Sequence, residues 1–355
     1  MRVSTEAKTI HCARPGGRRH PRSPSLRERI LLASILLSVI TCKGSGDEAL
    51  TLRIGVSQWP GFDVMHHARK ERLFEQRGLT VEWMTFDNQP ESTRAVTRGS
   101  VDAAFSSVWD TIHVDAGKDS PVLILVTDVS HGADGITARP GIASMTDLRG
   151  KRVAVRLGTI TQLILFEALA LHGMTPDDIE IVDIDMQETE RRMDDGTIDA
   201  TVSWEPKLSR ITAKTSGATV FTTREVDSLA VDGLVTSQKA LEHKREALIR
   251  LLMVWLDVMH DLETRPDQVY ANAGAAIGVD AETFASSYAG LERGDRSLNE
   301  EMFGQGRLLR AIRAHNELLR THGRTVRSDA IFGAEILSAA LARWRPLGSP
   351  AAPPE

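Results

Sequence analysis

The sequence predicts an α/β protein built from two similar lobes with a ligand cleft between them. Two observations carry this prediction. Strand-like and helix-like segments alternate along the chain, which is typical of sheets with parallel strands. In addition, three segments of the first half recur in the same order in the second half, at a nearly constant offset. A repeat of about a hundred residues is long enough for each copy to form a domain.

The repeat is clearest around two predicted strands. Residues 98–106 (RGSVDAAFS) recur as residues 195–203 (DGTIDATVS), an offset of 97. Residues 81–83 recur as 179–181 and residues 53–56 as 152–155, at offsets of 98 and 99. Two joined lobes form a cleft, and such clefts are where small ligands usually bind.

The first copy reads as strands and helices in turn. Residues 52–57 alternate like a strand and end in the turn Gln58-Trp-Pro-Gly61. Asp63 can cap a helix that ends at Gly78. The other expected strands are 79–86, 101–105 and 122–126, and the other expected helices are 90–97 and 106–116. The pattern predicts a largely parallel sheet.

The second copy follows a connecting stretch, 135–144. Its expected strands are 151–155, 179–184, 198–203 and 220–221, and apolar residues at helical spacing predict a helix over 161–172. The chain then crosses back at 231–235, and the expected helices are 239–264, 266–276, 281–291, 300–322 and 330–344. The predicted division is lobe 1 over 47–135, lobe 2 over 136–230, a return to lobe 1 with C-terminal helices over 231–345, and a disordered tail over 346–355.

Composition and charge limit the possible partners. The 355 residues are 41% hydrophobic and 26% charged, as in a soluble globular protein. Because the whole chain carries −5 and residues 1–29 contribute +6, the remainder carries −11. An acidic body does not attract a phosphate backbone, so nucleic acid is not an expected partner. We expect a monomer that binds a small solute.

Residues 1–46 are expected to be an export segment. Eleven uncharged residues, 30–40, follow a basic stretch, and this length fits a signal peptide rather than a membrane span. The expected location is the periplasm. Cys42 follows residues that loosely resemble a lipoprotein signal, so either acylation of Cys42 or ordinary cleavage is possible. The other cysteine is Cys12, which leaves no disulfide framework in the body.

Candidate ligand-binding residues lie at the carboxyl ends of the predicted strands and at the helix starts that follow them, where such sheets bind ligands. They are Ser57, Gln58, Trp59, Asp63, Asp87, Ser106 and Ser107 in the first copy, Gly158, Thr159, Thr161, Trp204 and Glu205 in the second, and Asp232 where the chain returns.

Five segments in order give the chain a family resemblance. They are 59–62 (WPGF), 72–81 (RLFEQRGLTV), 99–105 (GSVDAAF), 147–155 (DLRGKRVAV) and 198–206 (IDATVSWEP). Together they resemble the nitrate, sulfonate, taurine and thiamine-precursor branch of periplasmic solute-binding proteins, over about residues 50–325. The resemblance implies a type II periplasmic-binding-protein fold, hinge closure on a small solute, and delivery to an ABC permease with its ATPase. It also implies that the C-terminal helices return to the first lobe.

The candidate residues differ in chemical type from those expected at an anion-binding site. Trp59 and Trp204 beside Asp63, Glu205 and Asp232 suit a cation or an amine-bearing heterocycle, through cation–π attraction and charge-assisted hydrogen bonds. Arg156 would instead favour an anion, so a sulfonate, nitrate or taurine remains an open alternative.

Plainer structural roles are open for several of these residues. The two tryptophans can simply pack the lobe interface, Asp63 can be a helix N-cap, and Glu205 can complement a helix dipole. The repeated Asp102 and Asp199 are expected to bond backbone at the strand entrances rather than ligand.

Catalysis is not expected. No metal-ligand spacing, nucleophile elbow or phosphate loop is present, and His66-His67 is expected on an exposed helix face. No cofactor or metal is expected. A pyrimidine-synthesis enzyme of the same fold is a less favoured alternative. A periplasmic sensing module for a membrane signalling partner is the other.

Overall fold

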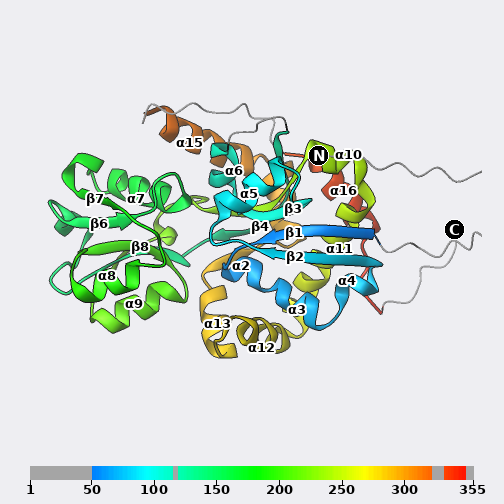
Figure 1. The fold of residues 1–355 in the computed structure, drawn as a ribbon, viewed down its shortest axis with the longest axis horizontal. Helices are drawn as coiled ribbons and strands as arrows, with labels where there is room; N and C mark the ends of the chain where they lie inside the picture. The colour runs from blue at the N-terminus through cyan, green and yellow to red at the C-terminus, as the bar shows by residue number, and fades with distance from the viewer. Residues whose placement is uncertain (1–49, 115–118, 322–331, 349–355) are drawn as a thin grey trace, which may run out of the picture. The chain divides into compact units, whose positions relative to one another are not determined.

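The computed structural model describes residues 50–114, 119–321 and 332–348, all within one compact unit, Ala49–Glu355. These residues form two β-sheets with helices packed against them (Figure 1). The expected export segment, Cys42 and residues 349–355 of the expected tail lie outside the described residues. In the part of the chain that is described, no helix has the length and apolarity needed to cross a membrane.

The two sheets have the same strand order. The first runs β11-β4-β10-β3-β1-β2 and the second runs β7-β6-β8-β5-β9, so β2-β1-β3-β10-β4 corresponds to β7-β6-β8-β5-β9. The first sheet contains β1 (Leu50–Val56), β2 (Leu79–Thr85), β3 (Ala103–Ser107), β4 (Pro121–Ser130), β10 (Val231–Ser237) and β11 (Leu291–Arg293). The second contains β5 (Asp134–Ala138), β6 (Arg152–Val155), β7 (Glu180–Asp183), β8 (Ala200–Trp204) and β9 (Ala218–Thr222). The repeat in the sequence is therefore a repeat in topology.

The correspondence extends to individual hydrogen bonds. Asp102 accepts from the backbone N–H of Arg53 at 2.8 Å and from its guanidinium at 2.8 Å. Asp199 makes the same two contacts with Arg152, at 2.9 Å and 2.9 Å. Each aspartate stands at the entrance of the central strand of its sheet, so the expectation that both bond backbone there is confirmed.

The expectation that residues 135–144 only connect the two copies is wrong in part, because most of a strand lies within them. Residues 134–138 form β5, which crosses from the first sheet and pairs antiparallel with β8 and β9. The chain returns through β10, which pairs antiparallel with β3 and β4. Each sheet is therefore mixed: three adjacent strands are parallel, and a crossing strand runs against them.

The helices follow the expected order with shorter segments. The predicted helix over residues 63–78 is broken into three. In the first copy the helices are α2 (Pro60–Asp63), α3 (Met65–Lys70), α4 (Leu73–Gln76), α5 (Gln89–Thr97) and α6 (Val108–His113). In the second they are η1 (Met145–Leu148), α7 (Ile160–Leu171), η2 (Pro176–Asp178), α8 (Thr189–Asp195), α9 (Lys207–Thr215) and η3 (Thr223–Glu225). The remainder are α10 (Gln238–His243), α11 (Arg245–Thr264), α12 (Pro266–Ile277), α13 (Ala281–Tyr288), α14 (Arg296–Asn299), η4 (Glu300–Gly304), α15 (Arg307–Thr321) and α16 (Ala334–Arg343).

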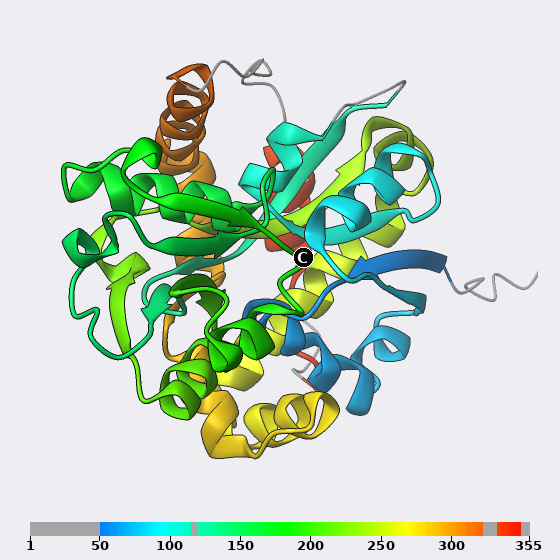
Figure 2. The ribbon, with the colours of Figure 1, turned by 60° about the vertical axis from the view of Figure 1, so that its left-hand side comes forward.

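The C-terminal helices return to the first lobe, as the resemblance implied. Trp255 of α11 is buried, and its ring lies 6.2 Å from that of Phe105 on β3. Figures 1 and 2 both show α12 and α13, in yellow, beside α2 and α3, in blue. The first lobe is therefore built from two stretches of chain that are far apart in sequence.

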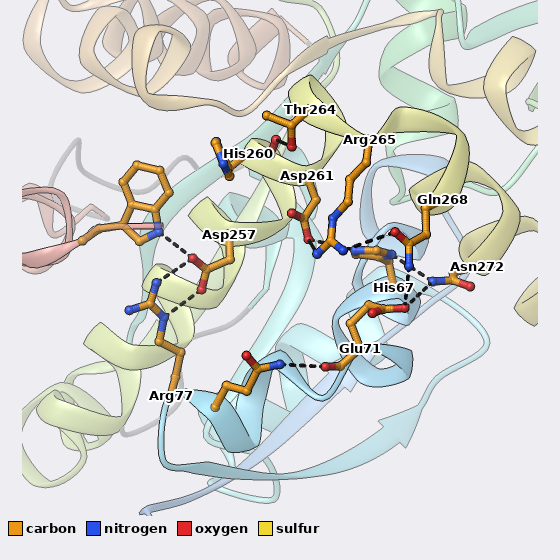
Figure 3. A network of polar contacts seen from close by, with 12 residues as sticks. His67, Glu71, Arg77, Asp257, His260, Asp261, Thr264, Arg265, Gln268 and Asn272 are labelled. Carbon is orange, nitrogen blue, oxygen red and sulfur yellow. Dashed lines mark hydrogen bonds and ion pairs between the residues drawn. The ribbon is translucent and has the colours of Figure 1, made fainter. Parts of the chain in front are cut away.

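The expectation that His66 and His67 lie on an exposed helix face is wrong for His67. Its side chain is fully buried, with Nε2 2.9 Å from Asp261 and Nδ1 3.0 Å from the amide nitrogen of Asn272 (Figure 3). Since the amide of Asn272 donates, Nδ1 accepts and Nε2 carries the proton toward the carboxylate. Arg265 also pairs with Asp261, at 2.8 Å. This network fastens α3 to α11 and α12.

Candidate functional site

A pocket of about 500 Å³ lies at the carboxyl ends of the parallel strands of both sheets. The loops after β1, β2, β6 and β7 contribute to its wall, as do the starts of α6, α7 and α9. The crossing strands β5 and β10 run against their neighbours, so they begin at this same edge and place Asp134 and Asp232 in the pocket. This is where mixed and parallel sheets bind ligands.

Eight of the candidate residues line this pocket. They are Ser57, Gln58, Trp59, Asp87, Thr159, Thr161, Trp204 and Asp232. Arg156 lines it as well. The rule that ligand groups follow strand ends therefore gathers residues separated by up to 175 positions, Ser57 and Asp232, around one cavity.

Three buried carboxylates form the floor of the pocket. Asp232 lies between Ser107 and Asp128 on the neighbouring strands, and Asp134 is paired across the second sheet with Trp204. Asp110 lies in the first turn of α6, directly after β3. Asp110, Asp134 and Asp232 all line the pocket, and each is less than 5% exposed.

The floor holds these carboxyl groups in a protonation state that is unusual for aspartate. Burial raises the pKa of Asp110 to about 7 and that of Asp134 to about 7. The pKa of Asp232 is raised well above its usual range, first by burial and then by the negative charges of Asp128, Asp134 and Asp110. Like charges that cannot reach water favour the protonated form, so at neutral pH these three groups are protonated far more than an ordinary aspartate.

Hydrogen bonds satisfy only part of this floor. Gln89 accepts from the backbone N–H of Ser107 at 2.7 Å and donates to Asp232. Ser107 donates to one oxygen of Asp110 at 2.9 Å, and a backbone hydrogen bond from Ile160 also acts to lower the pKa of this group. Asp110 Oδ1 and the hydroxyl of Ser57 are buried and have no well-formed hydrogen bond. Because a buried polar atom without a partner is costly, these two atoms mark where a ligand can bond.

The pocket wall as a whole is acidic. Seven carboxylate side chains and three cationic side chains line it. Arg210 pairs with Glu190 at 3.0 Å, and Arg156 lies 3.6 Å from Asp183. The ammonium of Lys207 donates to the backbone carbonyl of Met186, and burial lowers its pKa. Each of the three cations is therefore already engaged by another group, and no ion pair among the described residues involves Asp110, Asp134 or Asp232.

Aromatic rings complete the wall. Trp59 is buried, and its indole N–H donates to Asp128 at 3.0 Å, while Trp204 is half-buried beside Asp134. Among the described residues, no group of three or more His, Cys, Asp and Glu is arranged to hold a metal ion.

Five candidate residues do not line the pocket. Asp63 is the last residue of α2, whose N-cap is Trp59, so the expectation that Asp63 caps a helix is wrong. The broken helix begins at Pro60 because proline favours the first helical position. Asp63 is buried with one unpartnered oxygen, and its pKa is raised by burial. Its other oxygen lies 3.8 Å from His66.

The remaining four make local structural contacts. Ser106 is bonded to Thr93 at 2.7 Å, and Ser107 caps α6 by accepting from Asp110 N–H at 2.9 Å. Gly158 has a left-handed φ of +79° and donates to Gln162. Glu205 accepts from the hydroxyl and N–H of Ser209 in the first turn of α9, which is the helix-start role left open for it.

Sequence reasoning missed other residues of the pocket. Asp110 was missed because it lies within a predicted helix, 106–116, rather than at its predicted start. An aspartate three residues after a capping serine is nevertheless a recognisable sign of a helix start. Asp134 was missed because it stands one residue before the predicted connection, 135–144, and outside every predicted strand and helix. The further lining residues are Asn88, Gln89, Pro90, Glu91, Ile160, Asp185, Met186, Gln187, Glu190, Pro206, Lys207 and Arg210.

The fold and pocket define a class. Two sheets of identical strand order, exchanging one strand each and sharing a pocket at their carboxyl ends, are the type II periplasmic-binding-protein fold. The family follows from the sequence itself: residues 59–269 match the NMT1/THI5 like family model, so the chain belongs to that family.

Relatives of the chain are named as binding proteins. A binding protein of Brucella abortus (strain 2308) is 24% identical over 282 residues, covering 78% of this chain and 85% of the relative. An aliphatic sulfonates-binding protein of Bacillus subtilis (strain 168) is 27% identical over 242 residues, covering 64% and 71%. The periplasmic aliphatic sulphonate binding protein SsuA of Escherichia coli superposes with a TM-score of 0.60 at 20% identity, over 73% of this chain and 93% of SsuA.

The same fold also occurs in an enzyme. The desulfurization enzyme DSZB superposes with a TM-score of 0.60 at 16% identity, over 82% of this chain and 99% of DSZB. At that identity the likeness shows the fold alone. The relatives found by sequence are binding proteins, and function must be argued from the pocket.

Proposed function

We propose that this protein is the extracytoplasmic solute-binding component of an ABC importer. It encloses a small solute between its lobes and presents the closed form to a permease and its ATPase. The favoured solute carries an amine or a nitrogen heterocycle. Family membership and the names of the relatives support the binding role, since these relatives are binding proteins for small solutes.

The observation that carries this proposal is the shared pocket of about 500 Å³. Groups from both sheets line it, so a solute bound to one lobe gains further contacts when the other approaches. A ligand shifts a conformational equilibrium only by its differential affinity for the two forms. Trp204, from the second sheet, and Trp59, from the first, are the apolar surfaces that such closure would bring onto the solute.

The acidic wall supports a cationic or nitrogen-rich solute over an anion. Of the three cations of the wall, Arg156 and Arg210 are more than half exposed and paired with carboxylates, and Lys207 is bonded to a backbone carbonyl. The wall as a whole carries seven acidic and three cationic side chains, and this excess of acidic groups disfavours an anion such as a sulfonate. The B. subtilis and E. coli relatives are named for sulfonates and taurine, so an anionic solute is the outcome that would contradict this part of the proposal.

A titration of the purified protein tests the binding role. Small-angle scattering and calorimetry should show that a bound solute makes the protein more compact and that binding saturates at one site. Trp204→Ala should weaken binding at least tenfold, because the side chain lines the pocket. It should also lower stability modestly, because the half-buried ring packs against the core of the first lobe. Trp344→Ala, at a distance from the pocket, is the matched control. Equal loss in both variants would remove Trp204 from the site.

Export and anchoring form a separate part of the proposal. Residues 1–46 direct the chain to the periplasm, and Cys42 is the candidate for acylation. Mass spectrometry of the protein recovered from the producing cells tests both: an acylated N-terminal Cys42 supports anchoring, and an unmodified N-terminus downstream supports ordinary cleavage.

A further inference from the structure

We propose that the floor of the pocket recognises a cationic group bearing several N–H bonds, a primary ammonium or an amidinium, and that this group replaces protons held by Asp110, Asp134 and Asp232. The inference rests on the proposed binding function and deepens it, because it names the chemical group that the site reads. It also makes proton release part of binding.

The first argument is the convergence of the carboxyl groups. Asp110 comes from α6, Asp134 from the crossing strand β5 and Asp232 from the crossing strand β10, and all three reach one cavity. Their charges act on one another: Asp128, Asp134 and Asp110 each raise the pKa of Asp232. A floor of this kind needs either protons or an external cation to offset its charge.

The second argument is that, among the described residues, no ion pair of the protein offsets these three carboxyl groups. The positive charge that acts on Asp110 is Arg94 of α5, and Asp134 instead faces two more carboxylates, Asp128 and Glu205. Asp232 receives a neutral hydrogen bond from Gln89. Across the pocket, Lys207 is bonded to the Met186 carbonyl. The groups around the floor therefore leave these carboxyl groups to be neutralised by protons or by a cationic ligand.

The third argument is that two buried acceptors in the pocket favour cations with N–H groups over quaternary ammonium ions. The unpartnered Asp110 Oδ1 and the unpartnered hydroxyl of Ser57 are both buried and both belong to pocket-lining residues. An ammonium or amidinium can donate a hydrogen bond to each acceptor and to the carboxylates beside them. A quaternary ammonium has no N–H and would bury these acceptors without partners, which is costly. The pocket should therefore discriminate between cations of equal charge.

Proton exchange follows from the balance of charge. A carboxyl group that is protonated in the empty pocket must lose its proton before it can accept a hydrogen bond from the ligand's N–H group as a charged carboxylate. The proton leaves to solvent, and the ligand's cation takes its place. The affinity for the cation should then rise with pH, by up to about tenfold per unit for each proton released.

The test compares matched cations. Calorimetric titrations of the purified protein use 1,4-diaminobutane, acetamidine and the fully N-methylated diamine, in which both nitrogens are quaternary and carry no N–H. Each titration is run at pH 5.5 and 7.5, in buffers that differ in their heat of ionisation, so that the number of protons released can be measured. We expect the N–H cations to bind at least tenfold more tightly than the methylated diamine, more tightly at pH 7.5, and with proton release. Equal binding of the methylated diamine, or binding without proton release, would overturn the inference.

Variants connect the result to the floor. Asp134→Asn and Asp232→Asn should each weaken diamine binding at least tenfold and reduce the number of protons released. Asp194→Asn changes an exposed aspartate of α8 that pairs with Lys214, and it should leave both quantities unchanged. Binding unaffected by either floor variant would contradict the assignment.

Taurine and hexanesulfonate, titrated in parallel, separate this inference from the proposed function. Tight sulfonate binding without diamine or amidine binding refutes the cation floor and leaves the solute-binding role intact. If none of these probes binds saturably, the result counts against both the cation floor and the solute-binding role.

Discussion

Replacing Asp134 by asparagine should stabilise the empty protein at neutral pH. Asp134 is buried, and its pKa is raised to about 7 from an ordinary value of 3.8. Because one pKa unit corresponds to about 1.4 kcal/mol, ionising this group in the folded protein costs about 4 kcal/mol. Asparagine has the same shape, can still bond Ser130 and cannot ionise.

The pH dependence fixes the sign of this prediction. The pKa is raised on folding, so the unfolded chain releases the proton first, and stability falls as pH rises from about 4 to about 7. Near pH 4 the variant and the parent should be equally stable. At pH 8 the variant should be more stable by about 4 kcal/mol, which is roughly 8 °C in Tm for a protein of this size.

Thermal unfolding at pH 4, 6 and 8 measures the difference, with Asp194→Asn as the exposed control. An Asp134→Asn variant that is no more stable than the parent at pH 8 would refute the reasoning, because it would show that the charge of Asp134 is already offset in the empty pocket. The same variant should bind an amine more weakly. Higher stability with lower affinity is the signature of a site strained for its ligand.

Three further predictions concern the rest of the molecule. His67→Leu should lower the free energy of unfolding by about 2–4 kcal/mol in urea titrations, because it leaves Asp261 and Asn272 without their shared partner; a loss below about 0.5 kcal/mol would show that the network does not fasten α3. Asp102→Asn should cost more than Asp199→Asn at pH 7, by about 1 kcal/mol in the same assay, because Asp102 pairs with both Arg53 and Lys244 whereas Asp199 pairs with Arg152. Since the pKa of each aspartate is lowered on folding, both costs should fade as pH drops below about 4, and a cost that persists in acid would contradict the ion-pair origin. Gln89→Ala should weaken amine binding several-fold at constant fold, because Gln89 connects Ser107 to Asp232, and unchanged affinity would remove it from the floor.

Much of the fold follows from the sequence because the repeat constrains it. The offsets of 97 to 99 residues align Arg53 with Arg152 and Asp102 with Asp199, and these pairs make the same clamp in both sheets. Side chains at strand entrances and strand ends are fixed by strand polarity. This is why a rule about strand ends placed Ser57, Trp204 and Asp232 in one pocket.

The remainder depended on tertiary structure. Residues 134–138 contain a glycine and lack a strong alternating pattern, and they become a strand only because they exchange backbone hydrogen bonds with two neighbouring strands. His67 reads as a surface residue until α11 and α12 return to cover it. Asp110 reads as an ordinary helix residue, and its role depends on the burial supplied by elements distant in sequence.

A thermal-shift comparison at pH 7.5 tests the central claim most directly, because a ligand that binds the folded state must raise its melting temperature. Equal millimolar concentrations of 1,4-diaminobutane, its fully N-methylated form, taurine and hexanesulfonate are compared on the parent protein and on Asp232→Asn. The structure predicts a rise in Tm with the N–H cation on the parent that is lost in Asp232→Asn, and no rise with the sulfonates. A rise with taurine or hexanesulfonate alone would contradict it and point to the cations of the pocket wall, Arg156, Lys207 and Arg210, as the ligand-binding groups.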